Sequence, residues 1–300
     1  MAIHCFGSVN IDHVHQVRHF PRAGETLADL GYARHLGGKG LNQAIAARRA
    51  GAQVHMTGAV GADGRWIADR LAAEGIDVAN LAVLDAPTGH AVIYVTPDGE
   101  NSIVIHAGAN RAMDLDLIDR ALAAARPGDW WLVQNETAHV LDSAARARQA
   151  GLRVAFAAAP FDPLLAQDML AVVDLLALNE GEARDLGCAM GAEPEHWPTP
   201  AVLITLGARG ARLLAVDGWP ARPMGTGPKT AFECSAHPVQ ARDTTGAGDC
   251  FLGCFLASLD QGLAGPAALD RASLAAAISV TRAGAADAMP TAAEIAGGLP

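Results

Sequence analysis

Strand-like and helix-like segments alternate along most of this 300-residue chain, and this order constrains the fold more than any other sequence feature. Short apolar segments typical of buried strands occur at 3–9, 54–60, 130–135, 152–159, 174–179 and 201–207. Segments with helical character lie at 40–51, 63–75 and 137–151, and three alanine-rich helical stretches occupy the C-terminal part. Such alternation favours a parallel sheet covered by helices on both faces. The sequence therefore predicts an α/β fold with a mostly parallel central sheet.

Two stretches depart from this alternation. Residues 25–36 lack helical periodicity, and 90–108 read as two strands joined by a Pro-Asp-Gly turn, which is a hairpin signal. Together they predict a small β-sheet lid, contributed by about 12–36 and 88–108, although a plain hairpin decoration fits the pattern equally well. We expect residues 1–300 to form one domain, and the turn-rich segment 217–238 to be a long loop that borders a ligand or faces solvent.

Composition and charge exclude several classes of partner. The formal net charge is −10, which argues against nucleic acid and against an anionic membrane surface. No segment is apolar over the length that a membrane span needs, and the N-terminus runs directly into a strand rather than a signal sequence. The five cysteines form no C-x-x-C pair, which indicates a reducing environment. We therefore expect a cytoplasmic protein.

The segment ARDTTGAGDCF (241–251) suggests phosphate chemistry. Gly246, Ala247 and Gly248 precede an apolar helix, whose first N–H groups have no acceptor within the helix and so attract anions. The Asp249 carboxylate would repel such an anion, so its presence here suggests that it acts on a group beside the anion. In phosphoryl transfer, a base accepts the proton of the acceptor hydroxyl while N–H donors hold the phosphoryl group. An ordinary helix N-cap is the alternative for Asp249.

Two further glycine-rich segments, GGKG at 37–40 and LGARG at 206–210, also lie near predicted strand ends, where open α/β sheets bind ligands. The chain contains no G-x-x-x-x-G-K-[ST] P-loop. It also lacks G-x-G-x-x-G after its first strand, which weighs against a dinucleotide-dependent oxidoreductase.

The order of these motifs resembles that of a known family. The segments that carry the resemblance are GSVNIDHV (7–14), FPRAGET (20–26), GGKGLNQAIAARRAGA (37–52), ENSIVIHAGAN (100–110), LNEGEA (178–183), LITLGARG (203–210) and DTTGAGDCF (243–251). They span nearly the whole chain and are similar to those of the ribokinase-like (phosphofructokinase-B type) carbohydrate kinases. One departure is Ala158-Ala159-Pro160, where the family commonly carries Asn-Pro-Ala.

The resemblance implies a role for each matching position. Asp249 corresponds to the catalytic base, and Gly246, Ala247 and Gly248 to the anion hole. The positions that correspond to sugar-binding residues are Asn10, Asp12, Gly38, Lys39, Asn42 and Glu136. Those expected at the nucleotide are Asn179, Thr205, Gly207 and Gly210. Glu182 is expected to bind Mg²⁺ through water, which suits an ion that keeps most of its hydration shell. The residues implied for a monovalent cation, usually K⁺, are Asp243, Thr245, Ser279, Arg282 and Gly284.

The implied activity is ATP-dependent phosphorylation of a primary hydroxyl on a small sugar, with Mg²⁺ and K⁺ as cofactors. D-ribose, giving D-ribose 5-phosphate, is the expected acceptor. A kinase for another sugar or for a nucleoside is the first alternative, and a catalytically silent sugar- or nucleotide-binding regulator is the second. The resemblance also implies a homodimer formed through the lid, whose open sheet edge would otherwise be exposed.

Overall fold

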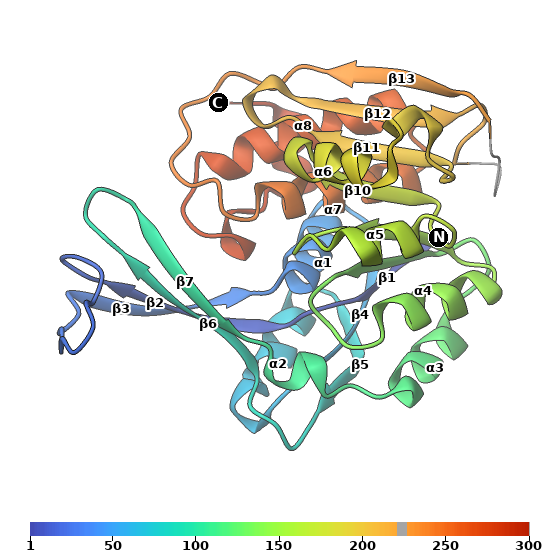
Figure 1. The fold of residues 1–300 in the computed structure, drawn as a ribbon. Helices are drawn as coiled ribbons and strands as arrows, with labels where there is room; N and C mark the ends of the chain where they lie inside the picture. Colours follow the sequence, from blue (N-terminus) through green and yellow to red (C-terminus); the bar gives the residue numbers. More distant parts are fainter. Residues whose placement is uncertain (221–226, 300) are drawn as a thin grey trace.

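The computed structural model describes residues 1–220 and 227–299 and contains two β-sheets (Figure 1). The larger sheet has nine strands. In spatial order they are β13 (Lys229–Cys234), β12 (Ala211–Val216), β11 (Ala201–Thr205), β10 (Leu175–Asn179), β9 (Arg153–Ala157), β8 (Trp130–Gln134), β1 (Ala2–Phe6), β4 (Gln53–Val60) and β5 (Asp77–Val83). All neighbouring pairs from β11 to β5 are parallel, whereas β12 and β13 are antiparallel to their neighbours. The predicted mostly parallel sheet is confirmed.

Helices cover both faces of this sheet (Figure 1). They are α1 (Lys39–Arg49), α2 (Trp66–Ala73), α3 (Leu115–Ala124), α4 (Val140–Gln149), α5 (Pro163–Met169), α6 (Glu180–Met190), α7 (Ala247–Asp260), α8 (Gly265–Val280) and α9 (Ala292–Gly297). Short 3₁₀ turns lie at Ala62–Gly64, Gly108–Arg111, Pro194–His196, Gly207–Arg209 and Ala286–Ala288. Helices α1, α2, α7 and α8 share one apolar core, and α3 to α6 share the other.

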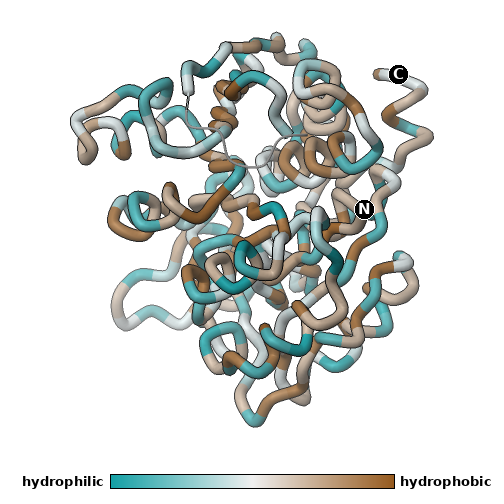
Figure 2. Tube along the Cα trace, turned by 90° about the vertical axis from the view of Figure 1, so that its right-hand side faces the viewer, coloured by the Kyte–Doolittle hydropathy of each residue, from teal (hydrophilic) through white to brown (hydrophobic). Residues whose placement is uncertain are grey.

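Side-chain alternation in the central strands builds these two cores. In β8, Trp130 faces the core that contains α1 and α7, while Trp131 faces the opposite core, and both are fully buried. Successive side chains of a strand point to opposite faces, so a strand buried on both sides is mostly apolar. The trace coloured by hydropathy in Figure 2 alternates between hydrophilic and hydrophobic residues along the chain, as helices with one buried face require.

The smaller sheet has four strands in the order β3 (Gly31–Gly37), β2 (Asn10–Gln16), β6 (Gly89–Val95) and β7 (Asn101–His106). It extends away from the main body on the left of Figure 1. Strands β6 and β7 pair antiparallel around the predicted Pro-Asp-Gly turn, where Gly99 has a φ of 87°. The predicted hairpin is therefore confirmed, and it joins β2 and β3 in one sheet.

Two local predictions differ from the structure. The expected loop over 217–238 contains strand β13, which pairs with β12 at the edge of the large sheet, and residues 221–226 lie outside the described residues. The expected helix over 63–75 is divided into a 3₁₀ turn at Ala62–Gly64 and α2. Within the described residues, no helix combines the length and the apolar character needed to cross a membrane.

Candidate active site

The site lies where the strand order of the large sheet reverses. The next strand of this sheet along the chain after β1 is β4, which pairs with one side of β1, and β8 later pairs with its other side. Open α/β sheets bind ligands beyond the carboxyl ends of the strands at such a switch point. Ser8 follows β1 and Glu136 follows β8, so both lie at this crevice.

Asp249 occupies the first turn of α7. Gly246 is the N-cap residue with a φ of 73°, a left-handed conformation that favours glycine, and an added Cβ would lie 2.9 Å from the Ala285 Cβ. The Ala247 amide donates to the Thr244 carbonyl at 3.2 Å. Gly248 and Asp249 are also in the first turn, whose amides have no acceptor inside the helix. An anion site at this helix start is therefore compatible with the backbone.

The Asp249 carboxylate is buried and bonded to two side chains of α1. Asn42 Nδ2 donates to Oδ2 at 3.1 Å, and Gln43 Nε2 donates to Oδ1 at 2.8 Å. Burial raises the pKa of Asp249; the Lys39 ammonium and the two amide donors oppose this rise, and the Glu136 carboxylate adds to it. The expected N-cap alternative does not hold, since Gly246 is the N-cap and Asp249 lies inside the helix. A buried carboxylate with a raised pKa is suited to accept a proton.

Asn42 and Glu136 place further polar groups beside this carboxylate. Asn42 Oδ1 is buried and has no hydrogen-bond partner in the described part of the chain, so its acceptor capacity is unused. The Glu136 carboxylate accepts hydrogen bonds from the Ser8 hydroxyl and, at 3.1 Å, from the Lys39 amide. Ser8 was not predicted from the sequence, although it stands in the GSVN segment directly after β1.

Asp12 projects from β2 toward the same cluster. An added Cβ on Gly37 would lie 2.2 Å from Asp12 Oδ1, so glycine leaves the space that this carboxylate occupies. Burial raises the pKa of Asp12 to about 6; the Glu136 carboxylate also raises it, and His35 lowers it. Gly38 next to it has a φ of 92°. Asp12 and Glu136 therefore form a pair of neighbouring acidic groups at the crevice.

Asn10 is held by a residue that sequence reasoning did not single out. Asn110 Nδ2 donates to Asn10 Oδ1 at 2.8 Å, and Asn110 Oδ1 accepts from the Val9 amide at 3.0 Å. Both asparagines are buried. An added Cβ on Gly89 would lie 2.2 Å from Asn110 Nδ2, so this contact depends on a glycine in β6. Asn110 is the last residue of the ENSIVIHAGAN segment (100–110). Its place in a segment that carries the family resemblance was the sequence feature that could have identified it.

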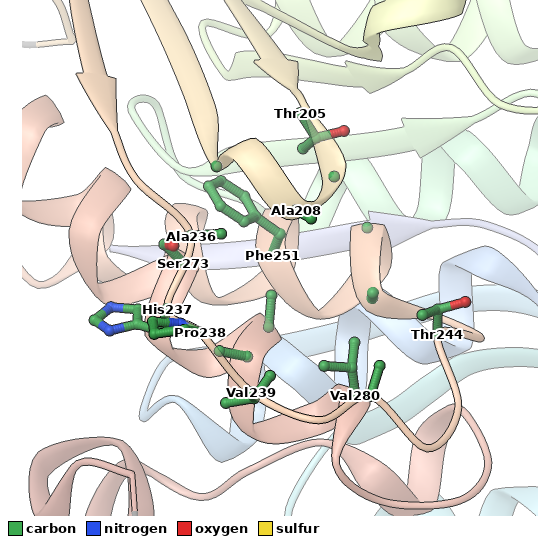
Figure 3. Close-up of a pocket in the computed structure, with 17 residues that line it drawn as sticks. Thr205, Ala208, Ala236, His237, Pro238, Val239, Thr244, Phe251, Ser273 and Val280 are labelled. Carbon is green, nitrogen blue, oxygen red and sulfur yellow. The ribbon is translucent and has the colours of Figure 1, made fainter.

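Two connected cavities lead away from Asp249. The first, of about 260 Å³, is lined by Lys39, Asn179, Glu182, Gly248 and Asp249 among others. The second, of about 350 Å³, lies between α7, α8 and the 3₁₀ turn at Gly207–Arg209, and Figure 3 shows Phe251, Ala208, His237 and Val280 around it. The residues that line both cavities are Thr205, Thr244, Ala247, Gly248 and Phe251. The two spaces therefore form one continuous cleft.

The predicted nucleotide residues are divided between these cavities. Gly207 and Gly210 line the larger one, Asn179 lines the smaller one, and Thr205 lines both. Gly210 has a φ of 106° and an added Cβ would lie 2.0 Å from the Cys234 carbonyl oxygen, so this turn requires glycine. Sequence reasoning missed the apolar lining from α8 and the segment after β13, which carries no phosphate motif.

Asn179 and Glu182 form a capping box at the start of α6. Asn179 Oδ1 accepts from the Glu182 amide at 2.9 Å, and Glu182 Oε2 accepts from the Asn179 amide at 2.8 Å. Glu182 therefore caps the start of α6. It also lines the smaller cavity, so the two roles coincide at one residue. With Oε2 engaged by the backbone, a half-buried carboxylate that reaches the cavity fits a hydrated Mg²⁺, which prefers oxygen ligands and retains water.

Asp243 joins the two segments predicted to bind a monovalent cation. Its Oδ1 accepts from the Thr245 amide at 2.9 Å and its Oδ2 from the Gly284 amide at 2.8 Å. Ser279 is buried, and its hydroxyl donates to the Ala276 carbonyl at 2.8 Å. The Arg282 guanidinium pairs with Glu294 at 2.6 Å, so its side chain is already engaged. Carboxylate, hydroxyl and carbonyl oxygens are suitable ligands for a hard cation such as K⁺, and Arg282 would supply only its carbonyl.

Comparison with known proteins identifies the family of this chain. The family model described as pfkB family carbohydrate kinase matches residues 2–292. The chain belongs to the pfkB family of carbohydrate kinases. It is 35% identical to the ribokinase of Haemophilus influenzae, over 95% of this chain and 94% of that protein.

Solved structures of ribokinases agree with this assignment. The crystal structure of ribokinase from Cryptococcus neoformans in complex with ADP is 33% identical, has a TM-score of 0.80 and matches 99% of both chains. The structure of Arabidopsis thaliana ribokinase complexed with ribose and ATP is 26% identical, has a TM-score of 0.82 and matches 99% of this chain and 98% of that one. The expected ribokinase-like fold is confirmed.

Proposed function

We propose that this pfkB-family kinase transfers the γ-phosphoryl group of ATP to the primary hydroxyl of D-ribose, which yields D-ribose 5-phosphate. The observation that carries the proposal is the position of Asp249, buried between the polar cluster of Asn42 and Glu136 and the cleft that leads past Gly248. The relatives add support, since one is named as a ribokinase with ribose and ATP and another as a ribokinase with ADP.

The sugar binds through groups already at the crevice. The unpartnered Asn42 Oδ1 accepts from one hydroxyl, and the Asp12 carboxylate accepts from others. Asn10, the backbone at Gly38, Lys39 and Glu136 complete the sugar site. Asp249 then accepts the proton of the primary hydroxyl as its oxygen attacks the phosphoryl group. The ordered amides and carboxylates hold the sugar in one orientation, which lowers the entropic part of the barrier.

The phosphate end of the cleft is built from backbone amides. The helix start at Gly246, Ala247 and Gly248 stabilises negative charge on the transferring phosphoryl group through its N–H groups and the dipole of α7. Asn179, Thr205, Gly207 and Gly210 bind the nucleotide. Glu182 would hold Mg²⁺ through water, and the bound ion would neutralise charge on the ATP phosphates. Residues Asp243, Thr245, Ser279, Arg282 and Gly284 would hold K⁺.

The chain is proposed to act as one kinase domain over 1–300, with the small sheet (about 12–36 and 88–108) as a lid. Closure of a lid excludes water from the reacting groups. The five cysteines are free thiols, which supports the expected cytoplasmic location.

The acceptor is tested by comparing kcat/KM for D-ribose, D-fructose, 2-deoxy-D-ribose, adenosine and inosine with Mg-ATP and K⁺. We expect D-ribose to be preferred by at least about tenfold, because site polar groups left without hydroxyl partners cost binding free energy. A preference for a nucleoside would contradict the assignment of ribose while leaving the role of Asp249 intact.

Ribose binding will weaken as the pH falls through about 6, the raised pKa of Asp12. The ionised carboxylate accepts hydroxyl hydrogen bonds, and protonation removes that capacity. One pH unit below its pKa the group is about one-tenth ionised, so calorimetry at pH 5 should give a dissociation constant about tenfold larger than at pH 8. Asp12→Asn should bind weakly at every pH, with no such inflection; a flat profile in the wild-type protein would contradict this role.

Asp243→Asn will abolish most of the activation by K⁺. The substitution removes a negative charge and one of the two acceptors that join residues 243–245 to Gly284. We expect kcat at saturating K⁺ to fall about tenfold, to the level seen in its absence. Arg282→Ala is the matched control, since its side chain pairs with Glu294 and only its carbonyl is assigned to the ion. Full K⁺ activation in Asp243→Asn would refute the cation site.

The small sheet is also the proposed dimer interface. Its edge strand β7 carries Ile103, Val104 and Ile105, which are 50%, 64% and 60% exposed. An exposed apolar edge strand readily pairs with another chain. Sedimentation velocity should give the mass of two chains for the wild-type protein. The double variant Ile103→Asp, Ile105→Asp should have the mass of one chain. Leu164→Asp, which changes an exposed leucine on α5, should leave the dimer intact; a wild-type monomer would exclude the interface.

A further inference from the structure

Two buried glutamines lie beside Asp249, and Gln43 also lines the smaller cavity next to it. Gln43 on α1 is 2% exposed and Gln134 at the end of β8 is 0% exposed. Gln134 Nε2 donates to Gln43 Oε1 at 2.7 Å, and Gln43 Nε2 donates to Asp249 Oδ1 at 2.8 Å. The three side chains thus form a continuous row from the central sheet to the carboxylate. Burying two amides is costly unless they are hydrogen-bonded, so this row requires an explanation.

The direction of the row is set by its far end. Gln134 Nε2 also lies 3.8 Å from Cys5 Sγ, and the Cys5 thiol donates to the Gly40 carbonyl at 3.2 Å. The Cys5 sulfur is therefore the acceptor toward Gln134, which keeps the amide nitrogen of Gln134 turned to Cys5 and Gln43. Because Gln43 must then present its oxygen to Gln134, its nitrogen points to Asp249. Both amides make these contacts in this orientation, which leaves Gln134 Oε1 buried without a hydrogen-bond partner among the described residues.

We propose that Gln43 and Gln134 are positioning residues for the catalytic base: they hold Oδ1 of Asp249 so that Oδ2, on the Asn42 side, faces the acceptor hydroxyl. This inference rests on the proposed kinase function and adds two residues to it. Neither glutamine needs to touch the sugar. Gln134 acts only through Gln43, since the contact that the structure gives it toward the carboxylate is the one to Gln43 Oε1.

Charged and titratable groups around Asp249 explain why a second amide donor is needed. Lys39 from α1 favours the ionised carboxylate, whereas Glu136 beyond β8 disfavours it. The thiols of Cys5 and Cys250 also face it, and burial raises the pKa of both to about 12, so they remain neutral. Burial itself favours the protonated carboxyl. Donation from Gln43 offsets part of that preference and keeps more of the base ionised at neutral pH.

A purely structural role for the two glutamines makes a different prediction. If they only filled space, then methionine, which has a similar length and no amide, would preserve the site. If they position and ionise Asp249, Gln43→Met must raise the pKa of Asp249 and move the acidic limb of the rate profile to higher pH. The titration of the carboxyl therefore separates the two roles, whereas loss of activity alone would not.

The direct test is a ¹³C NMR titration of the Asp249 carboxyl in the full-length protein, assigned with Asp249→Asn. We expect Gln43→Met to raise its apparent pKa by about one unit, as loss of one charge-assisted hydrogen bond implies, and Gln134→Met to raise it by less. The double variant should match Gln43→Met alone, because among the described residues Gln134 is linked to the carboxylate through Gln43. Gln53→Met, at an exposed position in β4, should change nothing.

Either of two results would overturn the proposal: an unchanged Asp249 titration in a folded Gln43→Met protein, or fully additive shifts in the double variant. If Gln43→Met does not fold, the test rests on Gln134→Met alone. A smaller rise in the pKa of Asp249 would then support the proposal, and an unchanged pKa would overturn it. Phosphoryl transfer measured by rapid quench should show the same displacement of the acidic limb. A wild-type protein that transfers no phosphoryl group would refute the kinase function, while the titration would still decide the positioning role.

Discussion

Asp249→Asn is expected to reduce the turnover of D-ribose by about 10²-fold or more, the effect typical of removing a general base. The amide cannot accept the hydroxyl proton, and within residues 1–220 and 227–299 no second carboxylate makes the same two amide contacts. Asn42 and Gln43 both donate to this group, so an amide at 249 also leaves one donor facing an NH₂ group. The loss should appear in kcat measured by ADP release.

Ribose affinity should change far less than turnover in this variant, because Asp12, Asn42 and Glu136 still bind the sugar. Calorimetry with ribose and with ADP provides this comparison. Asp142→Asn, at an exposed position on α4, is the matched control and should retain wild-type turnover. Turnover of Asp249→Asn within threefold of wild type would remove Asp249 from the reaction and would require another base.

The second large effect is on stability and comes from the contact between α1 and α7. Gly253 in α7 lies so close to α1 that an added Cβ would be 2.6 Å from both the Ala46 Cβ and the Gln43 carbonyl oxygen. This packing sets the distance between the side chains of Asn42 and Gln43 on one helix and Asp249 on the other. Gly253→Val must therefore separate the helices or strain their backbones.

We expect Gly253→Val to lower the free energy of unfolding by about 3 kcal/mol, the upper part of the range for overpacking a core, and to reduce turnover as well. Urea denaturation followed by circular dichroism measures the first effect. Gly187→Val in α6 is the control: an added Cβ there meets only the Ala192 carbonyl oxygen, at an ordinary 3.4 Å, and should change stability by less than about 1 kcal/mol. Equal midpoints for the two variants would contradict this account of the helix contact.

The central sheet was predictable because its signal is local. Strands such as β1 and β8 are mostly apolar, with His4 and Gln134 as their polar members, and each is followed by polar or glycine residues that end it. Strand β13 was mistaken for a loop because Lys229–Cys234 alternates weakly and is surrounded by turn-forming residues. Its pairing with β12 is a tertiary interaction that the local pattern does not contain.

In the site, too, local motifs were predictable and contacts between distant segments were not. Asp249 and its glycines form one contiguous motif, so sequence reasoning could place the base at a helix start. The link from Gln134 to Gln43 spans 91 residues and joins two amides, a residue type that carries no catalytic signature. Ser8 and Asn110 were missed for the same reason, since each acts by holding another residue across the fold. Positioning residues become visible only when the topology brings distant segments together.

The most direct test of the central claim is the identity of the product. The purified protein is incubated with Mg-ATP, K⁺ and D-ribose, and the phosphate ester is examined by ³¹P NMR. We expect a new monoester signal split by the two protons of a CH₂ group, because D-ribose has its single primary hydroxyl at C5, and this signal should grow about 10²-fold more slowly, or slower still, with Asp249→Asn. A phosphate on a CH carbon, or ATP left unconsumed with ribose, would contradict the claim that Asp249 activates a primary hydroxyl of this sugar.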